Sequence, residues 1–369
     1  MAFKDIIGQD RAVNILLKTM QRGRVPSSYL FSGESGIGKK LTAINLAKAL
    51  NCLGSEQSLD GNDVRVTSHD SRVTPYDCCD ECFSCKKINS GFHPDFLVIS
   101  PEGGLIKIEE IRSIDGVLSL KAFEGRYKVV IVDDADSMNM YAANAFLKTL
   151  EEPPENSLII LISSNPERLP DTIRSRCSRI NFTPLSRESC QKVIETVINR
   201  QSGDKIQPKG KKDEAKKKRS EKGLQPSALS DPGILPLLVR LSMGRPGHAV
   251  SRDLIEEREW HLSLLKEMLN GEKDGWASKE EMEKWFDLML IMIRDIAVIK
   301  VTQDETNLIN IDLREFLQKI SNSMDIKGII ENYHFLSTLR GYFYFNLNKS
   351  LTWNYTGSLL RKSMDITYA

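Results

Sequence analysis

The stretch of sequence that decides the fold is Gly33-Glu34-Ser35-Gly36-Ile37-Gly38-Lys39-Lys40, which fits the phosphate-loop pattern G-x-x-x-x-G-K up to its last position. The apolar residues Tyr29-Leu30-Phe31 precede it, and a helical pattern over Leu41–Leu50 follows it. The three glycines let backbone N–H groups close around phosphates, and Lys39 would reach the β and γ phosphates as a point charge. The sequence therefore predicts a nucleotide-binding loop. A glycine-rich turn without a ligand is the alternative.

The last position of the loop departs from the pattern. A Ser or Thr is expected there, because its hydroxyl ligates Mg²⁺, but Lys40 has no acceptor lone pair. Further along, an apolar strand ends in Asp133, which is placed to support Mg²⁺, and in Asp134, which replaces a water-polarising Glu and is one methylene shorter. A catalytic group misplaced by about 1 Å can lose on the order of 10²-fold in rate. Both departures weaken hydrolysis, so we expect ATP with Mg²⁺ to bind poorly or unproductively.

Short apolar segments alternate with helical patterns through the first 185 residues. After the strand that leads into the loop, the predicted strands are Phe96–Ile99, Val129–Val132 and Leu158–Ile162, and Tyr141–Leu150 is a predicted helix. Strands that are this uniformly apolar suit a parallel sheet with helices on both faces. The predicted fold class of this half is α/β.

Four cysteines have the spacing of a metal site. Cys79, Cys82 and Cys85 are separated by two residues each, and Cys52 lies upstream. Four thiolates suit tetrahedral Zn²⁺, and a closed site of this kind is structural. Redox chemistry is the competing interpretation, but a redox dithiol needs only one pair. The alternative ligands are Cys78 in place of Cys79, and the histidines His69 and His93.

The overall charge is nearly balanced, with 51 basic and 50 acidic side chains and a net charge of +1. A protein that gripped DNA along a broad surface alone would be more basic, so the balance favours a member of an assembly. No apolar run reaches the roughly 20 residues that span a bilayer, and the N-terminus lacks a signal-peptide pattern. We therefore expect a cytoplasmic protein without a membrane segment.

The pattern becomes purely helical after Pro184. It is interrupted by Gln201–Gly223, whose nine basic and four acidic residues give a net charge of +5 and which has almost no apolar side chains. This composition predicts a solvated, disordered insertion, with non-specific DNA contact as the minority interpretation. Glu280–Lys300 and Ile329–Leu351 are the longest helical stretches beyond it. Their apolar stripes predict a helical core or a subunit contact.

Several longer motifs identify a family. They are Ile7-Gly8-Gln9, the phosphate loop, the cysteine cluster followed by His93-Pro94-Asp95, the segment Asn144–Pro154 (NAFLKTLEEPP), and Pro170–Cys177 (PDTIRSRC). With these motifs the chain resembles the AAA+ clamp-loader subunits of bacterial DNA polymerase III, specifically from about Phe3 to Pro184 and more weakly beyond. The resemblance also supports the zinc module, since ATPase domains of this family carry one after the first helix.

The resemblance implies three domains. An AAA+ nucleotide-binding domain would cover residues 1–185, with the zinc module at about 52–85. A small helical lid would cover 186–251 and contain the insertion 201–223, and a helical collar for oligomerisation would cover 252–369. Subunits of this family form hetero-pentamers through their collars, open the sliding clamp and place it on primer-template DNA. The implied partners are therefore other clamp-loader subunits, the clamp and, through the assembly, DNA.

The resemblance also assigns roles to single residues. Arg176 matches the arginine of the family's Ser-Arg-Cys motif, which projects into the nucleotide site of the neighbouring subunit and stabilises charge on the γ phosphate. Ser164 or Asn165 corresponds to a polar sensor of that phosphate, although Ser-Asn-Pro is also good turn chemistry. In Gly244–Ala249 the sensor arginine sits two places from its position in hydrolysing subunits.

These features together predict a clamp-loader subunit that presents Arg176 as an arginine finger and hydrolyses ATP weakly or not at all. It would be a non-catalytic subunit of the polymerase holoenzyme. One alternative is an active AAA+ motor subunit of the same assembly. Another, of a different class, is a DNA-binding module that uses the zinc site and the Lys-rich insertion.

Overall fold

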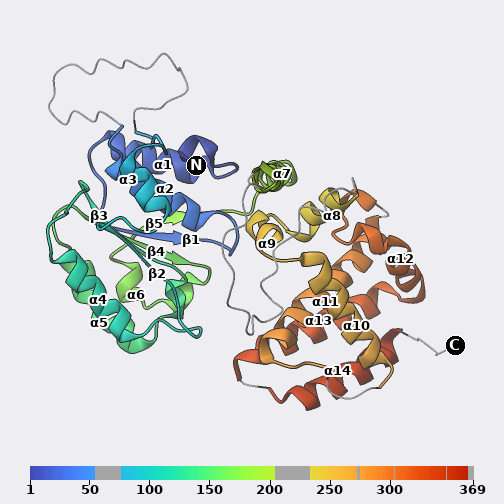
Figure 1. The fold of residues 1–369 in the computed structure, drawn as a ribbon. Coiled ribbons are helices and arrows are strands. Elements are labelled where there is room, and N and C mark those ends of the chain that lie inside the picture. Colours follow the sequence, from blue (N-terminus) through green and yellow to red (C-terminus); the bar gives the residue numbers. More distant parts are fainter. Residues whose placement is uncertain (55–75, 204–232, 272–274, 303, 346, 365–369) are drawn as a thin grey trace, which may run out of the picture. The chain divides into compact units, whose positions relative to one another are not determined.

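The computed structural model of the chain describes residues 1–54, 76–203, 233–271, 275–302, 304–345 and 347–364. The chain divides into two compact units, Met1–Val193 and Ile194–Ala369 (Figure 1). The first is α/β, and the described part of the second is helical. His69 and the part of the predicted insertion from residue 204 to 223 lie outside the described residues. The further division of the helical half at residue 251 stays a prediction.

The regular elements follow one another along the chain in two groups. The first group is α1 (Asp10–Gln21), β1 (Ser28–Ser32), α2 (Lys39–Asn51), α3 (Phe83–Asn89), β2 (Phe96–Ile99), α4 (Ile108–Leu118), β3 (Lys128–Val132), α5 (Met140–Glu151), β4 (Ser157–Ser163), α6 (Asp171–Arg174), β5 (Ser178–Asn181) and α7 (Arg187–Gly203). The second group is α8 (Ile234–Leu241), α9 (Pro246–Ser251), α10 (Leu254–Leu269), α11 (Lys279–Thr302), α12 (Arg314–Ser323), α13 (Ile326–Gly341) and α14 (Lys349–Met364).

The five strands form one parallel sheet in the order β2-β3-β4-β1-β5. In β1, Tyr29 is paired with Ile160 of β4 on one side and with Ser178 of β5 on the other. Because all strands run the same way, their carboxyl ends meet at one edge of the sheet, which is where ligands of such sheets bind. The phosphate loop, Asp133 and Ser164 all follow strand ends and therefore lie along this edge.

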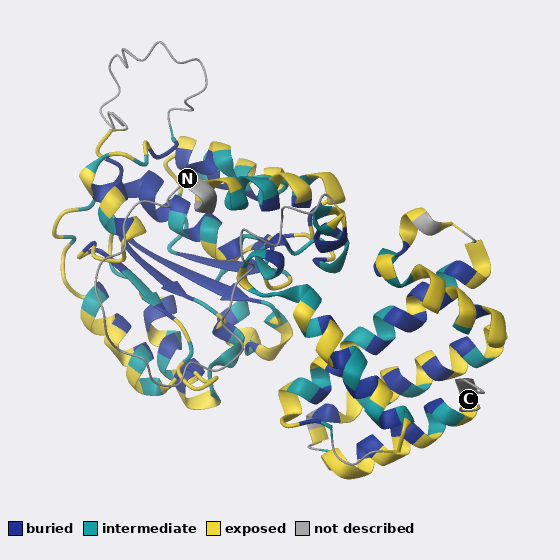
Figure 2. Ribbon diagram, turned by 45° about the vertical axis from the view of Figure 1, so that its right-hand side comes forward, coloured by how far each residue is buried: buried dark blue, intermediate teal, exposed yellow. Residues whose placement is uncertain are grey.

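Helices cover both faces of the sheet, as the uniformly apolar strands predict. Figure 1 shows α1, α2 and α3 on one side and α4 and α5 on the other, and Figure 2 shows the strands buried between them. Alternate strand residues such as Leu30, Val130 and Ile159 pack with Ile114 of α4 and Phe146 of α5 in one cluster. The predicted parallel α/β sheet is confirmed by this arrangement.

Two local details differ from the sequence-based expectation. The edge strand β5 was not predicted, because only Ile180 of its four residues is buried and its sequence, Ser-Arg-Ile-Asn, gives no apolar run. The helical stretch predicted over Ile329–Leu351 is not continuous. It is interrupted where α13 ends at Gly341 and a 3₁₀ turn follows over Tyr342–Phe345 before α14 begins. Glycine is a weak helix former, which favours an end at this point.

The helical unit is organised around aromatic side chains. The Trp276 ring lies 4.8 Å from that of Trp353 and 5.3 Å from that of Trp285, and the Phe286 ring lies 4.9 Å from that of Phe343. All five side chains are at most 4% exposed. Large rings in edge-on contact contribute both apolar area and favourable quadrupole geometry. The apolar stripes of this half are therefore core, as one of the two interpretations of the sequence predicted.

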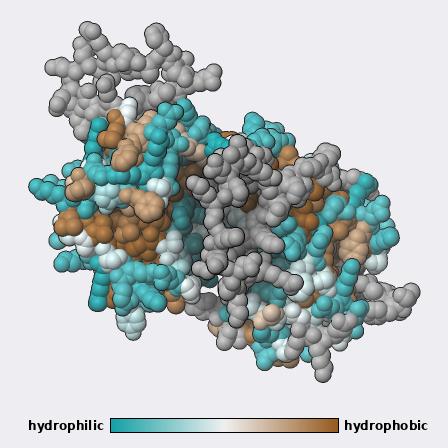
Figure 3. All heavy atoms as spheres, in the orientation of Figure 1, coloured by the Kyte–Doolittle hydropathy of each residue, from teal (hydrophilic) through white to brown (hydrophobic). Residues whose placement is uncertain are grey.

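The surface carries apolar residues as well as charge, as Figure 3 shows for one face of the molecule. In the α/β unit, Phe92 is 82% exposed and Phe123 is 81% exposed. Among the described helices, none has the length and apolarity needed to cross a membrane.

Candidate nucleotide and metal sites

The phosphate loop connects β1 directly to α2, and its glycines adopt backbone conformations that other residues avoid. The φ angle is 145° at Gly33, 79° at Gly36 and 99° at Gly38. A methyl group added at Gly33 would overlap the carbonyl oxygen of Phe182 and lie 2.9 Å from Ile37 Cδ1. The loop shape therefore requires glycine at its first position, both for its φ and for the close approach of the chain after β5.

Gln9 holds the loop from outside. Its amide nitrogen donates to the carbonyl oxygens of Ile37, at 3.1 Å, and Thr183, at 2.8 Å, and the side chain is buried. It thus ties the loop to the segment that follows β5. In the sequence Gln9 is only part of a family motif, and nothing there indicates that its side chain is buried against these two carbonyl groups.

Lys39 is turned into the loop. The residue is 5% exposed, and its Nζ donates to the carbonyl oxygens of Gly33, at 2.5 Å, and Glu34, at 2.6 Å. Burial lowers the pKa of Lys39 from its ordinary value, against the opposing charges of Asp134, Asp133 and others nearby. Its ammonium is therefore positioned inside the loop, where the phosphate pattern places it.

Lys40 makes a contact that the sequence did not predict. Its Nζ lies 2.9 Å from Oδ2 of Asp133, which follows the last residue of β3. The Lys40 side chain is 47% exposed and that of Asp133 is 19% exposed. Both residues stand at positions that hold Mg²⁺ in an intact phosphate-loop site, one by a hydroxyl and the other by a carboxylate. Here the first is replaced by an ammonium and the second is paired with it.

The remaining acidic residues of this edge have separate surroundings. Asp134 has a left-handed backbone, with φ 45° and ψ 48°. Burial raises the pKa of Asp134, and so do the negative charges of Asp133 and Asp136. Like charges that crowd together favour the protonated form, which a water-activating base has to avoid. The geometry therefore gives Asp134 a poor environment for that role.

Asp136 organises the end of β4. Its Oδ1 accepts hydrogen bonds from Ser163 Oγ, at 2.7 Å, and from the backbone N–H of Ser164, at 3.1 Å. Ser164 is half-buried, while Asn165 is exposed. The predicted sensor position thus lies beside the acidic segment after β3. Asp136 follows Asp133 and Asp134 closely in the sequence, but nothing in the pattern indicated that its side chain accepts hydrogen bonds from the end of the neighbouring strand.

Arg176 lies at the opposite end of the strands, where their amino ends meet. It comes two residues before β5 begins, and its carbonyl oxygen accepts a hydrogen bond at 2.7 Å from the hydroxyl of Ser28, the first residue of β1. The loop follows the last residue of β1, so the length of that strand, about 13 Å at 3.3 Å per residue, separates the two. The structure therefore places Arg176 and the chain's own phosphate loop at opposite edges.

The Arg176 side chain is accessible and already oriented. Its Nη1 donates to the carbonyl oxygen of Thr172 at 2.8 Å, and its Nη2 lies 2.5 Å from Oε1 of Glu151, the last residue of α5. The side chain is 34% exposed. Arg174, two residues earlier, is paired instead with Glu167 and Asp171. Glu151 belongs to the quoted Asn144–Pro154 segment, but the sequence did not indicate that it contacts Arg176.

The four predicted cysteines come together in space. The sulfur atoms of Cys52, Cys79, Cys82 and Cys85 all lie within 4.8 Å of one another, with 3.5 Å between those of Cys52 and Cys79. Tetrahedral zinc with Zn–S bonds of about 2.3 Å requires sulfur atoms about 3.8 Å apart. Backbone N–H groups also point at the sulfurs, from Cys79 to Cys52 and from Cys82 to Cys79, each at 3.3 Å. The cluster is thus positioned to bind one metal ion.

Two of the alternative metal ligands, Cys78 and His93, are among the described residues. Cys78 is buried, and its sulfur lies 3.8 Å from the carbonyl oxygen of Met1, outside the group of four. His93 is also outside that group. Its Nδ1 accepts a hydrogen bond from the backbone N–H of Asp95, whose carboxylate accepts three more from residues 123–125. Cys79, rather than Cys78, therefore completes the four-thiol group.

A lysine of α2 binds the cysteine segment. Lys48 of α2 is 1% exposed, and its Nζ donates to Asp80 Oδ1 at 2.6 Å. Hydrogen bonds from Lys48, from the N-terminal amine and from Asn89 hold the pKa of Asp80 below its ordinary value, although burial alone would raise it. The metal cluster is in this way anchored to the helix that begins at the phosphate loop.

The predicted lid arginine has local contacts. Arg245 immediately precedes α9, and its Nε donates to the carbonyl oxygen of Ser242 at 3.4 Å. Its role as a sensor stays a prediction.

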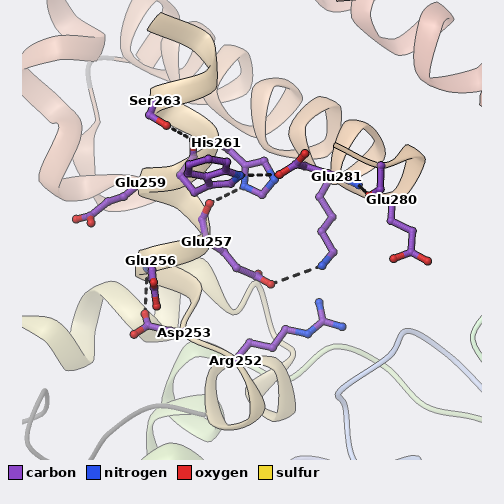
Figure 4. A pocket seen from close by; sticks show the side chains of 12 residues that line it. Arg252, Asp253, Glu256, Glu257, Glu259, His261, Ser263, Glu280 and Glu281 are labelled. Carbon is purple, nitrogen blue, oxygen red and sulfur yellow. Dashed lines mark hydrogen bonds and ion pairs between the residues drawn. The ribbon is translucent and has the colours of Figure 1, made fainter. Parts of the chain in front are cut away.

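A cavity of about 660 Å³ lies between α10 and α11 in the helical unit (Figure 4). Half of the residues that line it are acidic. Trp260 donates through Nε1 to Glu281 at 2.6 Å, and Lys284 lies 3.6 Å from Glu257. None of the site residues predicted from the sequence lines this cavity.

Comparisons with known proteins agree with the motifs of the α/β unit. Residues 8–186 match the family model described as DNA polymerase III, delta subunit. The delta' subunit of DNA polymerase III from Bacillus subtilis is 34% identical over 194 residues, which cover 52% of this chain and 53% of that protein. The tau subunit from Escherichia coli is 32% identical over 197 residues, which cover 53% of this chain and 28% of that protein.

The chain thus spans about half, or less, of the length of these curated relatives. Among solved structures, a DNA polymerase III gamma subunit-related protein from Thermotoga maritima is 18% identical, with a TM-score of 0.41, covering 95% of this chain and 99% of that one. The sequence matches, not this structural one, carry the relationship. The N-terminal half of this chain is therefore homologous to the delta', gamma and tau subunits of bacterial DNA polymerase III.

Proposed function

We propose that this protein is a clamp-loader subunit of DNA polymerase III of the delta' type, which supplies Arg176 to the ATP site of a neighbouring subunit. In this role it helps to place the sliding clamp on primer-template DNA during replication, in the cytoplasm, within a hetero-pentamer. It is a non-catalytic member of the holoenzyme. The homology of residues 8–186 supports the clamp-loader assignment, and a match to a delta' subunit over about half of both chains supports the type.

The position of Arg176 carries the proposal. It lies at the amino edge of the sheet, opposite the phosphate loop, and its guanidinium is both exposed and held by Thr172 and Glu151. An arginine in this place has no access to the chain's own nucleotide, but it can meet a phosphate presented by another subunit. A guanidinium that is pre-oriented loses little freedom when it binds, which suits the transition-state role of an arginine finger.

The contacts of the phosphate loop support the second part of the proposal, that this chain does not itself hydrolyse ATP. Lys40 removes one Mg²⁺ ligand by substitution and pairs with the other, Asp133. Asp134 stands where a catalytic base is required, but its pKa is raised by burial and by like charges. Hydrolysis needs the metal to neutralise charge and a base to orient water, and this site is deficient in both. An active motor subunit is the less favoured alternative for this reason.

We assign the four-cysteine cluster to structural Zn²⁺. All four sulfurs are available to the ion, so no position is left for a catalytic water, and the segment it closes is polar and short. The exposed Phe92 and Phe123 offer apolar groups for contact with a protein partner. Residues 252–369 are assigned to the collar through which the subunits assemble, and residues 186–251 to the lid. The second alternative is DNA binding through the insertion and the zinc module.

ATP turnover tests the proposal. We expect the isolated chain to hydrolyse ATP no faster than its own Lys39→Ala variant, because one metal ligand is replaced by Lys40 and the other, Asp133, is paired with it. Mixed with the motor subunits of the loader, the same chain should raise turnover at the neighbouring ATP site by about 10³-fold or more, the range of arginine fingers. An isolated chain that turns over ATP as fast as motor subunits do would contradict the proposal and favour the active-ATPase alternative.

Deletion of the insertion tests the DNA-binding alternative. Removing Ser202–Gly223 takes out most of the basic insertion. If the chain binds DNA through it, affinity and its dependence on salt should both fall steeply, since each lost phosphate contact lowers the salt slope by about one. We expect neither to change in the isolated chain by more than about twofold.

A further inference from the structure

The phosphate loop contains two adjacent lysines in different settings. Lys39 is buried and bound to the loop carbonyls, whereas Lys40 is half-exposed and contacts Asp133 at 2.9 Å. They are the first two residues of α2, whose N-cap, Gly38, has no side chain to accept from the free N–H groups. Two cations at the N-terminus of a helix interact unfavourably with the positive end of the helix dipole. An anion seated on the loop relieves that repulsion.

Lys40 also takes over what the metal does in an intact site. There, Mg²⁺ is held between the eighth loop position and the strand aspartate, and it neutralises phosphate charge. Here the eighth position is Lys40, and its ammonium contacts the same aspartate, Asp133. A divalent ion would have to displace this cation and would find only one of its two protein ligands. The place of the metal is thus filled by a side chain of the chain itself.

We propose that this loop binds the phosphate chain of a nucleotide as the metal-free anion, with the Lys40 ammonium in place of Mg²⁺. The inference rests on the proposed function, because it concerns the loop there taken to be non-hydrolysing. The bound nucleotide stabilises the loop and the start of α2 without being consumed. Lys39 and Lys40 supply the positive charge, and the glycine-rich backbone supplies the N–H donors.

The geometry predicts an unusual dependence on metal. Intact sites bind the Mg²⁺ complex of ATP. This loop should prefer free ATP, because complexation removes negative charge from the ligand and adds an ion that Lys40 opposes. One charge-assisted hydrogen bond corresponds to a factor of about 10 or more in affinity. We therefore expect ATP to bind at least about tenfold more tightly in EDTA than in excess Mg²⁺.

Calorimetric titration of the full chain tests this expectation. The ligands are ATP and inorganic tripolyphosphate, each in EDTA and in excess Mg²⁺. The second ligand separates recognition of phosphate alone from recognition of a nucleotide. Lys40→Thr restores the hydroxyl of the usual loop, so its metal dependence should reverse, with Mg²⁺ strengthening ATP binding about tenfold. Lys121→Thr removes an exposed lysine outside the site and should behave as wild type. Far-UV circular dichroism checks that each variant is folded.

The inference would be overturned by wild-type binding that requires Mg²⁺, by no wild-type binding of either ligand at about 1 mM, or by a Lys40→Thr variant with unchanged metal dependence. Tripolyphosphate that binds while ATP does not would also contradict it, since the occupant would not be a nucleotide. These failures are separable from failure of the proposed function. A chain that fails here and still stimulates its neighbours through Arg176 retains the proposed role.

Discussion

The substitution Gly33→Ala tests the structure of the phosphate loop most sharply. Gly33 has a φ of 145°, and an alanine Cβ there would overlap the carbonyl oxygen of Phe182 and lie 2.9 Å from Ile37 Cδ1. A non-glycine residue in such a conformation costs about 1–3 kcal/mol, and forcing backbone apart in a packed region costs about 1–3 kcal/mol more. We expect the α/β unit to lose about 2–6 kcal/mol of unfolding free energy.

The substitution Gly116→Ala is a matched control, because it should raise the stability of the same unit. Gly116 lies within α4, with an ordinary φ and no atom within 4 Å of an added Cβ. Alanine is the better helix former by about 0.5–1 kcal/mol, so Gly116→Ala should stabilise the same unit by that amount. The two variants add the same methyl group, and the difference between them isolates the backbone geometry of the loop.

The distribution of tryptophan provides the assay. All four tryptophans lie between residues 260 and 353, in the helical unit. Tryptophan fluorescence in urea therefore follows the unfolding of the helical unit alone. Hydrogen exchange of the β1 and β4 amides measures the unfolding free energy of the α/β unit. Gly33→Ala should shift the hydrogen exchange and leave the fluorescence transition unchanged. A Gly33→Ala chain within about 0.5 kcal/mol of wild type in β1 exchange would refute the loop geometry.

Two further predictions concern the metal cluster and a buried histidine. Cys79→Ser should reduce bound zinc, measured by mass spectrometry of the purified chain, by at least about tenfold, and Cys78→Ser should retain one ion per chain; the reverse pattern would exchange their assignments. Burial lowers the pKa of His261, so the unfolded state binds more protons below its ordinary value of 6.5, and stability present above that pH is lost as the pH falls. His261→Asn should flatten the pH dependence of unfolding between about pH 7 and pH 5, and equal slopes in wild type and His261→Asn would contradict this.

Much of the α/β unit follows from the sequence because its signals are local. Apolar strand segments, the glycine spacing of the loop and the Cys-x-x-Cys repeats each depend on residues close in the chain. The strands predicted at Phe96–Ile99, Val129–Val132 and Leu158–Ile162 correspond to β2, β3 and β4, with ends within two residues. The four-cysteine grouping was expected on the same basis, and the structure brings those sulfurs together.

What the sequence did not predict depends on contacts between distant segments. The ion pair of Lys40 with Asp133 joins residues 93 positions apart, and the pair of Arg176 with Glu151 joins the end of α5 to the loop before β5. Strand β5 has only one buried residue and is defined by its pairing with β1 rather than by its own pattern. The choice of Cys79 over Cys78 likewise follows from the direction of adjacent side chains, which spacing alone does not distinguish.

The most direct test of the central claim is steady-state ATP turnover by the reconstituted loader in the presence of clamp and primed DNA, with Arg176→Ala in this subunit. Arg174→Ala is the matched control, since Arg174 lies two residues away but is paired with Glu167 and Asp171. The account predicts that Arg176→Ala lowers turnover at the neighbouring site by about 10³-fold or more, without loss of assembly, and that Arg174→Ala leaves it within about threefold of wild type. Turnover that stays at the wild-type rate with Arg176→Ala would contradict the account.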